Sequence, residues 1–311
     1  MRVNSLSGRS LLSVNDLSSP EFQAIIDLSI RIKKSLKANL FSLEKEGTVV
    51  PLVFQKPSTR TRLSLEVACR LLKAHPIYLG WNEMQLSRGE PITDTIRVME
   101  RMANCVVARV NSHLDLVTMK QASKIPIVNA LSDKEHPLQI LADFMTLKEK
   151  RGGFENLTIA YVGDGNNVSN SLILGAAKVG ATIRVATPES LKPDIEIVAA
   201  AKVEAEKTKG EVQLVTSPQK AVDGANVVYT DVWVSMGQES ESSKKIDLLK
   251  PYQVNETLLS LAQQEAFVMH CLPAHRGQEI TDGVINSPRS IVFDQAENRL
   301  YTAMAVLYSI L

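Results

Sequence analysis

Residues 54–62, FQKPSTRTR, carry hydroxyl and guanidinium groups at a point where an apolar strand turns into a helix. Ser58, Thr59 and Thr61 can each donate a hydroxyl hydrogen, and Arg60 can add a charge-assisted hydrogen bond. The first turn of a helix also presents unpaired N–H groups and the positive end of the helix dipole, which favour an oxyanion. The pattern therefore predicts a phosphate-binding site. The alternative is an ordinary helix capped by Ser or Thr, with solvated arginines.

Strand-like and helix-like segments alternate along the chain, which is typical of parallel sheets covered on both faces by helices. Predicted strands of a first series lie at 49–54, 77–79, 105–110 and 125–129, and those of a second series at 157–162, 182–186, 212–215, 227–229 and 267–269. In the helix after the first strand, Leu63, Val67 and Leu71, with Ala68 and Leu72, mark the predicted buried face.

The predicted fold class is α/β, with two doubly wound parallel-sheet domains joined by helices. A helix predicted at 136–150 ends at Arg151-Gly152-Gly153, which marks a domain junction. We therefore expect one domain at 1–150 and another at 151–296, each of ordinary size. Residues 297–311 form an apolar helical segment, which we expect to pack back on the first domain.

Composition narrows the possible partners. The 311 residues include 35 Lys and Arg and 34 Asp and Glu, interspersed, so no basic field is available for nucleic acid or an anionic membrane. Cys69, Cys105 and Cys271 have no metal-ligand spacing, and an odd, sparse set of cysteines fits a reducing compartment. No apolar run approaches the ~18 residues of a membrane span. We expect a soluble, cytoplasmic protein without nucleic-acid or membrane partners.

Polar residues follow the predicted strands, where open parallel sheets bind their ligands. In the first series, Arg109 and His136 are suited to neutralising a phosphate and polarising a carbonyl group. In the second series, Asn167, Asp231 and Cys271 suit a small zwitterion with an ammonium group. Structural roles are the alternatives: an ion pair for Arg109, a helix cap for His136 and a buried inert thiol for Cys271. A buried Asp231 would require a cationic partner, which could be a substrate or a lysine.

The sequence disfavours a dinucleotide-binding site and a metal site. Gly163 and Gly165 follow a predicted strand, but Val168 occupies the place of the third glycine of a dinucleotide-binding motif. The remaining histidines form no ligand spacing with cysteine, so we expect no metal site. The Ser/Glu/Lys-rich residues 238–245 are predicted to form a mobile surface loop.

Seven segments, in order, resemble the aspartate/ornithine carbamoyltransferase family over essentially the full chain. They are 54–62, Arg109, 136–143, 163–167, 231–239, 270–273 and 297–299. The first and third are shared across the family, whereas Ser235-Met236-Gly237 and His270-Cys271-Leu272-Pro273 resemble the ornithine branch. Gln55 departs from the pattern, because many relatives carry Glu there.

The resemblance implies transfer of the carbamoyl group of carbamoyl phosphate to the δ-amine of L-ornithine, giving L-citrulline and phosphate without a cofactor. The residues implied to bind carbamoyl phosphate are Ser58, Thr59, Arg60, Thr61, Gln85, Arg109, His136, Gln139, Cys271, Leu272 and Arg299. Those implied to bind L-ornithine are Asn167, Asp231, Ser235 and Met236. Catalytic roles are implied for Arg109, His136, Asp231 and Cys271. Gln85 resembles a residue donated by a neighbouring subunit, which implies a homotrimer with shared active sites.

Three alternatives stay open at this point. The first is another carbamoyltransferase, whose acceptor would be putrescine, an acetylated ornithine or aspartate. A non-catalytic family member would serve as a binding or regulatory subunit, but would be expected to lack at least one of the five residues Arg60, Arg109, His136, Asp231 and Arg299, all of which are present. A generic Rossmann-type binding module would leave the predicted phosphate site unexplained.

Overall fold

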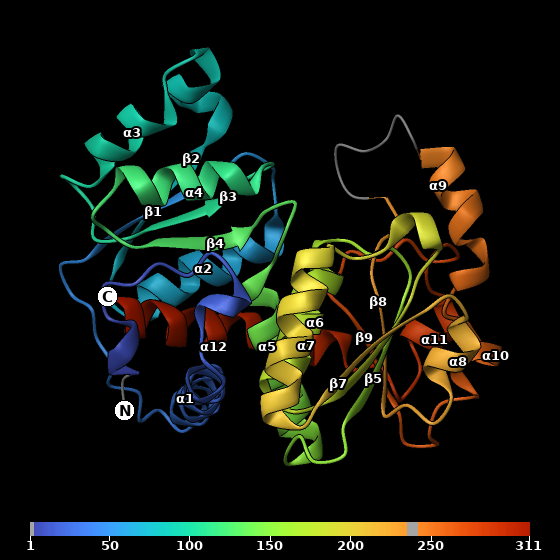
Figure 1. Cartoon of the computed structure of the whole chain (residues 1–311). Coiled ribbons are helices and arrows are strands. Elements are labelled where there is room, and N and C mark those ends of the chain that lie inside the picture. Colours follow the sequence, from blue (N-terminus) through green and yellow to red (C-terminus); the bar gives the residue numbers. More distant parts are fainter. Residues whose placement is uncertain (1–2, 235–241) are drawn as a thin grey trace. The chain divides into compact units, whose positions relative to one another are not determined.

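The structure, a computed structural model, describes residues 3–234 and 242–311. It divides into two compact units, with Met1–Met145 and Glu297–Leu311 in unit 1 and Thr146–Ala296 in unit 2. In each unit the described strands form a parallel sheet with helices on both faces (Figure 1). The predicted fold class is confirmed. Helices α5 (Pro137–Arg151) and α12 (Val292–Ile310) contain the boundaries between the units.

The sheet of unit 1 has the strand order β2-β1-β3-β4. Its strands are β1 (Val49–Phe54), β2 (His75–Gly80), β3 (Val106–Arg109) and β4 (Ile127–Leu131), and neighbouring strands are parallel. Helices α3 (Ile92–Met99) and α4 (His113–Ala122) cover one face, while α1 (Ser19–Lys37), α2 (Thr59–Leu71) and α12 lie on the other (Figure 1). The chain leaves β1 for β2 on one side and returns to β3 on the other. The carboxyl ends of β1 and β3 therefore form the switch point at which such sheets bind ligands.

The sheet of unit 2 has the order β7-β6-β5-β8-β9, so its switch point lies between β5 and β8. Its strands are β5 (Thr158–Val162), β6 (Thr182–Ala186), β7 (Glu211–Val215), β8 (Val227–Thr230) and β9 (Phe267–His270). Helices α6 (Asn167–Lys178) and α7 (Ile195–Thr208) lie on one side, and α8 (Pro218–Val222), α10 (Glu256–Leu259) and α11 (Asp282–Ile285) on the other (Figure 1). Helix α9 (Ser242–Leu249) follows the undescribed residues 235–241.

Local sequence signals explain how the two helices next to the switch points begin. Ser58 is the N-cap of α2, and its Oγ accepts the Thr61 N–H at 3.4 Å, which confirms that 58–61 form the first turn. Asn166 is the N-cap of α6 and accepts two backbone N–H groups, at 3.0 and 3.1 Å. A Cβ on Gly165 would lie 2.2 Å from the Leu191 carbonyl oxygen, so the turn into α6 requires glycine.

Three expectations differ from the structure. Ala68 and Leu72 of the predicted face are buried, but Leu63 is 62% exposed and α2 also buries Leu65 and Cys69, because the apolar face is rotated from the predicted one. The C-terminal helix begins at Val292, before the predicted 297. The loop prediction for 238–245 is wrong for 242–245, which belong to α9, and 238–241 lie outside the described residues.

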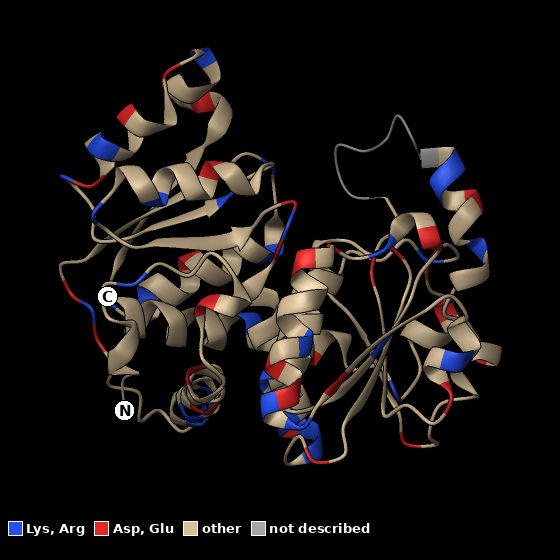
Figure 2. Ribbon diagram, viewed as in Figure 1, with Lys and Arg blue, Asp and Glu red and all other residues tan. Residues whose placement is uncertain are grey.

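Charge is distributed as the composition predicts. Lys and Arg alternate with Asp and Glu along the described ribbon of both units, without a continuous field of one sign (Figure 2). Among the described helices, none combines the length and apolar character needed to cross a bilayer. A strong local electrostatic potential must therefore come from particular buried charged side chains.

Candidate active site

The hydroxyl groups predicted to bind phosphate are organised by hydrogen bonds in unit 1. Ser58 Oγ donates to Thr61 Oγ1 at 3.1 Å, and Thr61 is only 1% exposed. On the same turn Thr59 is exposed and Arg60 is half-buried. These side chains surround the first turn of α2, where N–H groups and the helix dipole favour an anion.

Arg299, on α12, reaches the same turn although it is 238 residues from Thr61 in the sequence. Its guanidinium donates to Thr61 Oγ1 at 3.2 Å and also to Gln139 Oε1. Gln139 in turn donates to Asp143 Oδ1 at 2.8 Å. Arg299 and Gln139 are both buried. The structure thus places three of the predicted phosphate-site residues in direct contact.

Arg109 and His136 are buried at the same edge of the unit 1 sheet. Arg109 is the last residue of β3, and His136 directly precedes α5. Burial lowers the pKa of His136 well below its usual value, and the positive charges of Arg299 and Arg109 lower it further. His136 is therefore neutral near pH 7, and its imidazole is able to donate one hydrogen bond without carrying charge.

Gln55 has a role that the sequence did not reveal. Its backbone N–H donates to the Arg109 carbonyl at 2.8 Å, and its side-chain oxygen accepts the Asn111 N–H at 2.5 Å. Its amide also donates to Asp115 Oδ2 at 3.4 Å. A Glu carboxylate at position 55 would have no N–H group to donate to Asp115. Gln55 therefore links the loops that follow β1 and β3.

Gln85 is not brought to this site within one chain. It begins the 3-10 helix Gln85–Arg88 and is exposed. Among the described residues, no hydrogen bond links its side chain to the turn at 58–61. Its predicted role across a subunit boundary stays a prediction.

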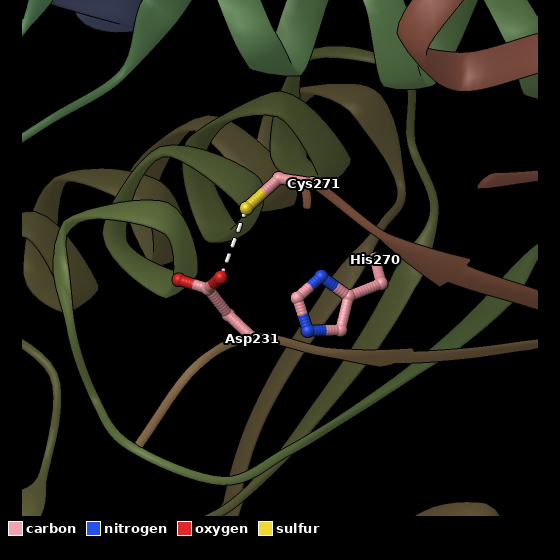
Figure 3. Close-up of side chains that lie close together, drawn as sticks. All are labelled: Asp231, His270 and Cys271. Atoms are coloured by element: carbon pink, nitrogen blue, oxygen red, sulfur yellow. Dashed lines mark hydrogen bonds between the residues drawn. The ribbon is translucent and has the colours of Figure 1, made fainter. Parts of the chain in front are cut away.

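Asp231 is the central group of the unit 2 site. It follows β8 and is 4% exposed. Asn166 Nδ2 donates to its Oδ2 at 2.7 Å, and Cys271 Sγ donates to its Oδ1 at 2.9 Å (Figure 3). The expected cationic partner is not found among the described residues. These neutral donors satisfy the hydrogen bonding of the carboxylate but not its charge, so the site is suited to a cationic ligand.

His270 lies beside this pair. The nearest ligand atoms of Asp231, His270 and Cys271 are within 4.8 Å of one another (Figure 3). Both nitrogens of His270 are already engaged, because Nδ1 accepts the Leu272 N–H at 2.9 Å and Nε2 lies 3.1 Å from Glu279 Oε1. Accepting at Nδ1 places the ring proton on Nε2. A metal ion would have to displace these bonds, and the expectation of no metal site stays a prediction.

The remaining predicted residues of the acceptor site are placed as follows. Asn167 is the first residue of α6 and is half-buried. Leu272, next to Cys271, has a left-handed φ of 57°, which its N–H bond to His270 helps to hold. Ser235 and Met236 lie outside the described residues.

Three residues around Asp231 were missed. Asn166 carries the ordinary signal of an N-cap, a polar residue between a strand and an apolar helix, but its second bond to Asp231 leaves no trace in the sequence. Tyr161 is buried and donates to the Asp164 carbonyl at 2.8 Å and to Asn166 Oδ1 at 3.3 Å. Lys245 lies 2.6 Å from Asp164 Oδ2 and is 81 residues away in the sequence.

Comparison with known proteins agrees with this arrangement. The carbamoyl-P binding domain of the aspartate/ornithine carbamoyltransferases matches residues 9–149, and their Asp/Orn binding domain matches residues 155–310. The chain belongs to the aspartate/ornithine carbamoyltransferase family.

Its similar relatives include enzymes named for ornithine. The catabolic ornithine carbamoyltransferase of Thermoplasma acidophilum is 47% identical over 306 residues, which cover 98% of this chain and 99% of that protein. The anabolic ornithine carbamoyltransferase of Pyrococcus furiosus is 45% identical over 305 residues, covering 98% and 97%. A solved structure of ornithine carbamoyltransferase from P. furiosus superposes with a TM-score of 0.94 at 44% identity, covering 98% and 97%.

Proposed function

We propose that the protein transfers the carbamoyl group of carbamoyl phosphate to the δ-amine of L-ornithine, giving L-citrulline and phosphate. The observation that carries this proposal is Asp231, a buried carboxylate whose described partners are neutral. A negatively charged acceptor such as aspartate would meet this charge with its own side-chain carboxylate, whereas an amine is attracted to it. The relatives named above act in both directions by name, so either direction is compatible with this site.

Unit 1 supplies the groups for carbamoyl phosphate. The hydroxyls of Ser58, Thr59 and Thr61, with Arg60 and Arg109, would bind the phosphate at the N-terminus of α2. His136, Gln139 and Arg299 would hold the carbamoyl end. When the amine attacks, the carbonyl oxygen becomes an oxyanion, to which Arg109, His136 and Thr61 donate. A neutral His136 suits this role, since its N–H bond strengthens as negative charge develops.

Unit 2 supplies the groups for the amino acid. Asn167 and Asp231, together with Ser235 and the Met236 backbone, would bind the α-carboxylate and α-ammonium groups. Asp231 and Cys271, which are hydrogen-bonded to each other, would orient the δ-amine and assist its deprotonation, and the backbone at Cys271 and Leu272 would contact the carbamoyl group. An alkyl ammonium has a pKa near 10.4, so on the order of one molecule in a thousand is a nucleophile at neutral pH. Transfer should therefore accelerate as the pH rises.

The proposal also covers the roles of the two domains, the assembly of the protein and its cellular compartment. Residues 1–150 with 297–311 would bind carbamoyl phosphate, and 151–296 would bind ornithine. The exposed position of Gln85 supports its donation to a neighbouring subunit of a homotrimer. Three cysteines without a described disulfide support a reducing, cytoplasmic compartment.

The test is citrulline formation from carbamoyl phosphate and L-ornithine, measured beside putrescine, N-acetylornithine and aspartate as acceptors. Arg60→Ala is the blank, because it removes a phosphate-binding charge without touching the core. Citrulline formed with ornithine alone would support both reaction and acceptor. Turnover with another acceptor only would refute the proposed role of Asp231, and no turnover by a folded trimer would indicate a non-catalytic protein.

A further inference from the structure

Lys245 and Asp164 form a largely buried ion pair in unit 2, close to Asp231. Lys245 Nζ lies 2.6 Å from Asp164 Oδ2, and the two side chains are 16% and 9% exposed. Asp164 follows β5 at the switch point, whereas Lys245 comes from α9. The pair therefore brings a positive charge from a separate helix to the carboxyl edge of the sheet.

The two carboxylates, Asp164 and Asp231, influence each other. Burial raises the pKa of Asp164, Lys245 opposes that shift, and the negative charge of Asp231 adds to it. Two buried carboxylates that lie near each other without a cation do not both remain ionised at low cost. Lys245 reduces this conflict, because its positive charge compensates the charge of Asp164.

The turn that carries Asp164 also holds Asp231. The Asp164 carbonyl accepts the Asn166 N–H at 2.8 Å, and the side chain of Asn166 donates to Asp231 Oδ2 at 2.7 Å. Tyr161 donates to the same carbonyl. Asp164 and Asp231 are thus linked through hydrogen bonds to one residue, Asn166.

We infer that Lys245 supports ornithine binding at the acceptor site: it compensates the charge of Asp164, so that Asp231 is the carboxylate left to receive the ammonium group of the substrate. This inference rests on the proposed function. Without Lys245, Asp164 would compete with Asp231 for the substrate amine or would capture a proton. Either result weakens ornithine binding and leaves carbamoyl phosphate binding, in unit 1, unchanged.

The experiment compares three variants of the full chain. Lys245→Met removes the charge, Lys245→Arg keeps it, and the double variant Lys245→Met/Asp164→Asn removes both charges of the pair. Lys178→Met is the control for loss of a buried lysine, because Lys178 forms another ion pair in unit 2, 3.3 Å from Glu204, with side chains 5% and 16% exposed, and Glu204 also keeps Lys207 at 3.1 Å. KM for ornithine, KM for carbamoyl phosphate and the melting temperature are measured for each.

We expect Lys245→Met to raise the ornithine KM roughly 10- to 100-fold, since it leaves a buried charge unpaired. The carbamoyl phosphate KM should stay within about twofold. Lys245→Arg and the double variant should recover most of the ornithine affinity, because neither leaves an unpaired carboxylate at position 164. Lys178→Met should lower the melting temperature without changing either KM.

Several results would overturn the inference. An unchanged ornithine KM in Lys245→Met would show that Lys245 has no part in acceptor binding. A parallel rise of both KM values, or an equal effect of Lys178→Met, would show a merely structural pair. A double variant as impaired as Lys245→Met would exclude charge compensation. A wild-type chain that forms no citrulline refutes the proposed function and this inference with it, whereas the preceding results refute the inference alone.

Discussion

Asp231→Asn should lower activity and leave stability intact, and this combination separates a binding carboxylate from a structural one. The substitution keeps the shape of the side chain and removes its charge. The described partners of Asp231 are the neutral groups of Asn166 and Cys271, at 2.7 and 2.9 Å. A structural carboxylate would instead be paired with a cation, and removing its charge would leave that cation unpaired in the interior.

The size of the effect follows from these contacts. A hydrogen bond to a charged group contributes about 1.5–3 kcal/mol, and about 1.4 kcal/mol corresponds to a tenfold change in affinity. The loss of the ammonium–carboxylate contact therefore predicts a fall of about 10- to 150-fold in kcat/KM for ornithine. Asn avoids burying a charge but weakens one of the two existing bonds. The free energy of unfolding should therefore change by less than about 1 kcal/mol.

The assay is steady-state kinetics with each substrate varied in turn, combined with thermal denaturation. Asp194→Asn is the matched control: it makes the same chemical change at the N-cap of α7, where Asn caps as well as Asp, so activity and stability should both be unchanged. A fall in stability of about 3 kcal/mol or more in Asp231→Asn would identify a structural charge pair and refute the reasoning. An unchanged kcat/KM for ornithine would show that the substrate amine does not bind at Asp231.

Further predictions concern the other groups of the two sites. Arg299→Met should raise the KM for carbamoyl phosphate about 10-fold or more, since Thr61 and Gln139 lose a charged donor, and an unchanged KM would contradict this placement. His136→Gln should lower kcat about 10²–10³-fold if His136 donates to the oxyanion. The same variant should lose less stability than the wild type as the pH falls. In the folded wild type the pKa of His136 is lowered, so the free energy of unfolding decreases below about pH 6.5, where His136 of the unfolded chain binds a proton. Denaturant titrations from pH 7 to 5 test this, and equal slopes for both proteins would contradict it. Cys271→Ser should shift the pH dependence of kcat/KM for ornithine if the thiol assists deprotonation; an unchanged rate and profile would exclude that role.

The sequence predicts the strands well, because strand formation depends on local signals. The runs at 49–54 and 182–186 are apolar and rich in β-branched residues, and the strands have the predicted bounds. Ser58 is followed directly by a helix, so its capping role and the location of the first turn were readable from neighbouring residues.

Features that depend on tertiary contacts were not predicted. The apolar residues of α2 allow more than one buried face, and packing decides that Leu65 is buried while Leu63 is exposed. Lys245 lies in a polar segment with a second lysine beside it, and nothing local marks it as the partner of Asp164. The sequence predicts a cationic partner for a buried Asp231 without deciding between a substrate and a lysine, and the hydrogen-bond partners of Asp231 among the described residues are the neutral groups of Asn166 and Cys271.

Unit 1 concentrates positive charge at its candidate site and unit 2 concentrates negative charge. This opposite distribution is compatible with the mixed, nearly neutral composition of the chain. Unit 1 carries Arg60 and Arg299 at the first turn of α2 and Arg109 at the end of β3, and the charges of Arg299 and Arg109 help to keep His136 neutral. Unit 2 instead buries a carboxylate among neutral donors and compensates the second carboxylate with Lys245. In the proposed function, a dianionic donor and a cationic acceptor would each be matched by a unit of opposite local charge. Neither preference requires a net charge on the protein, which is +1.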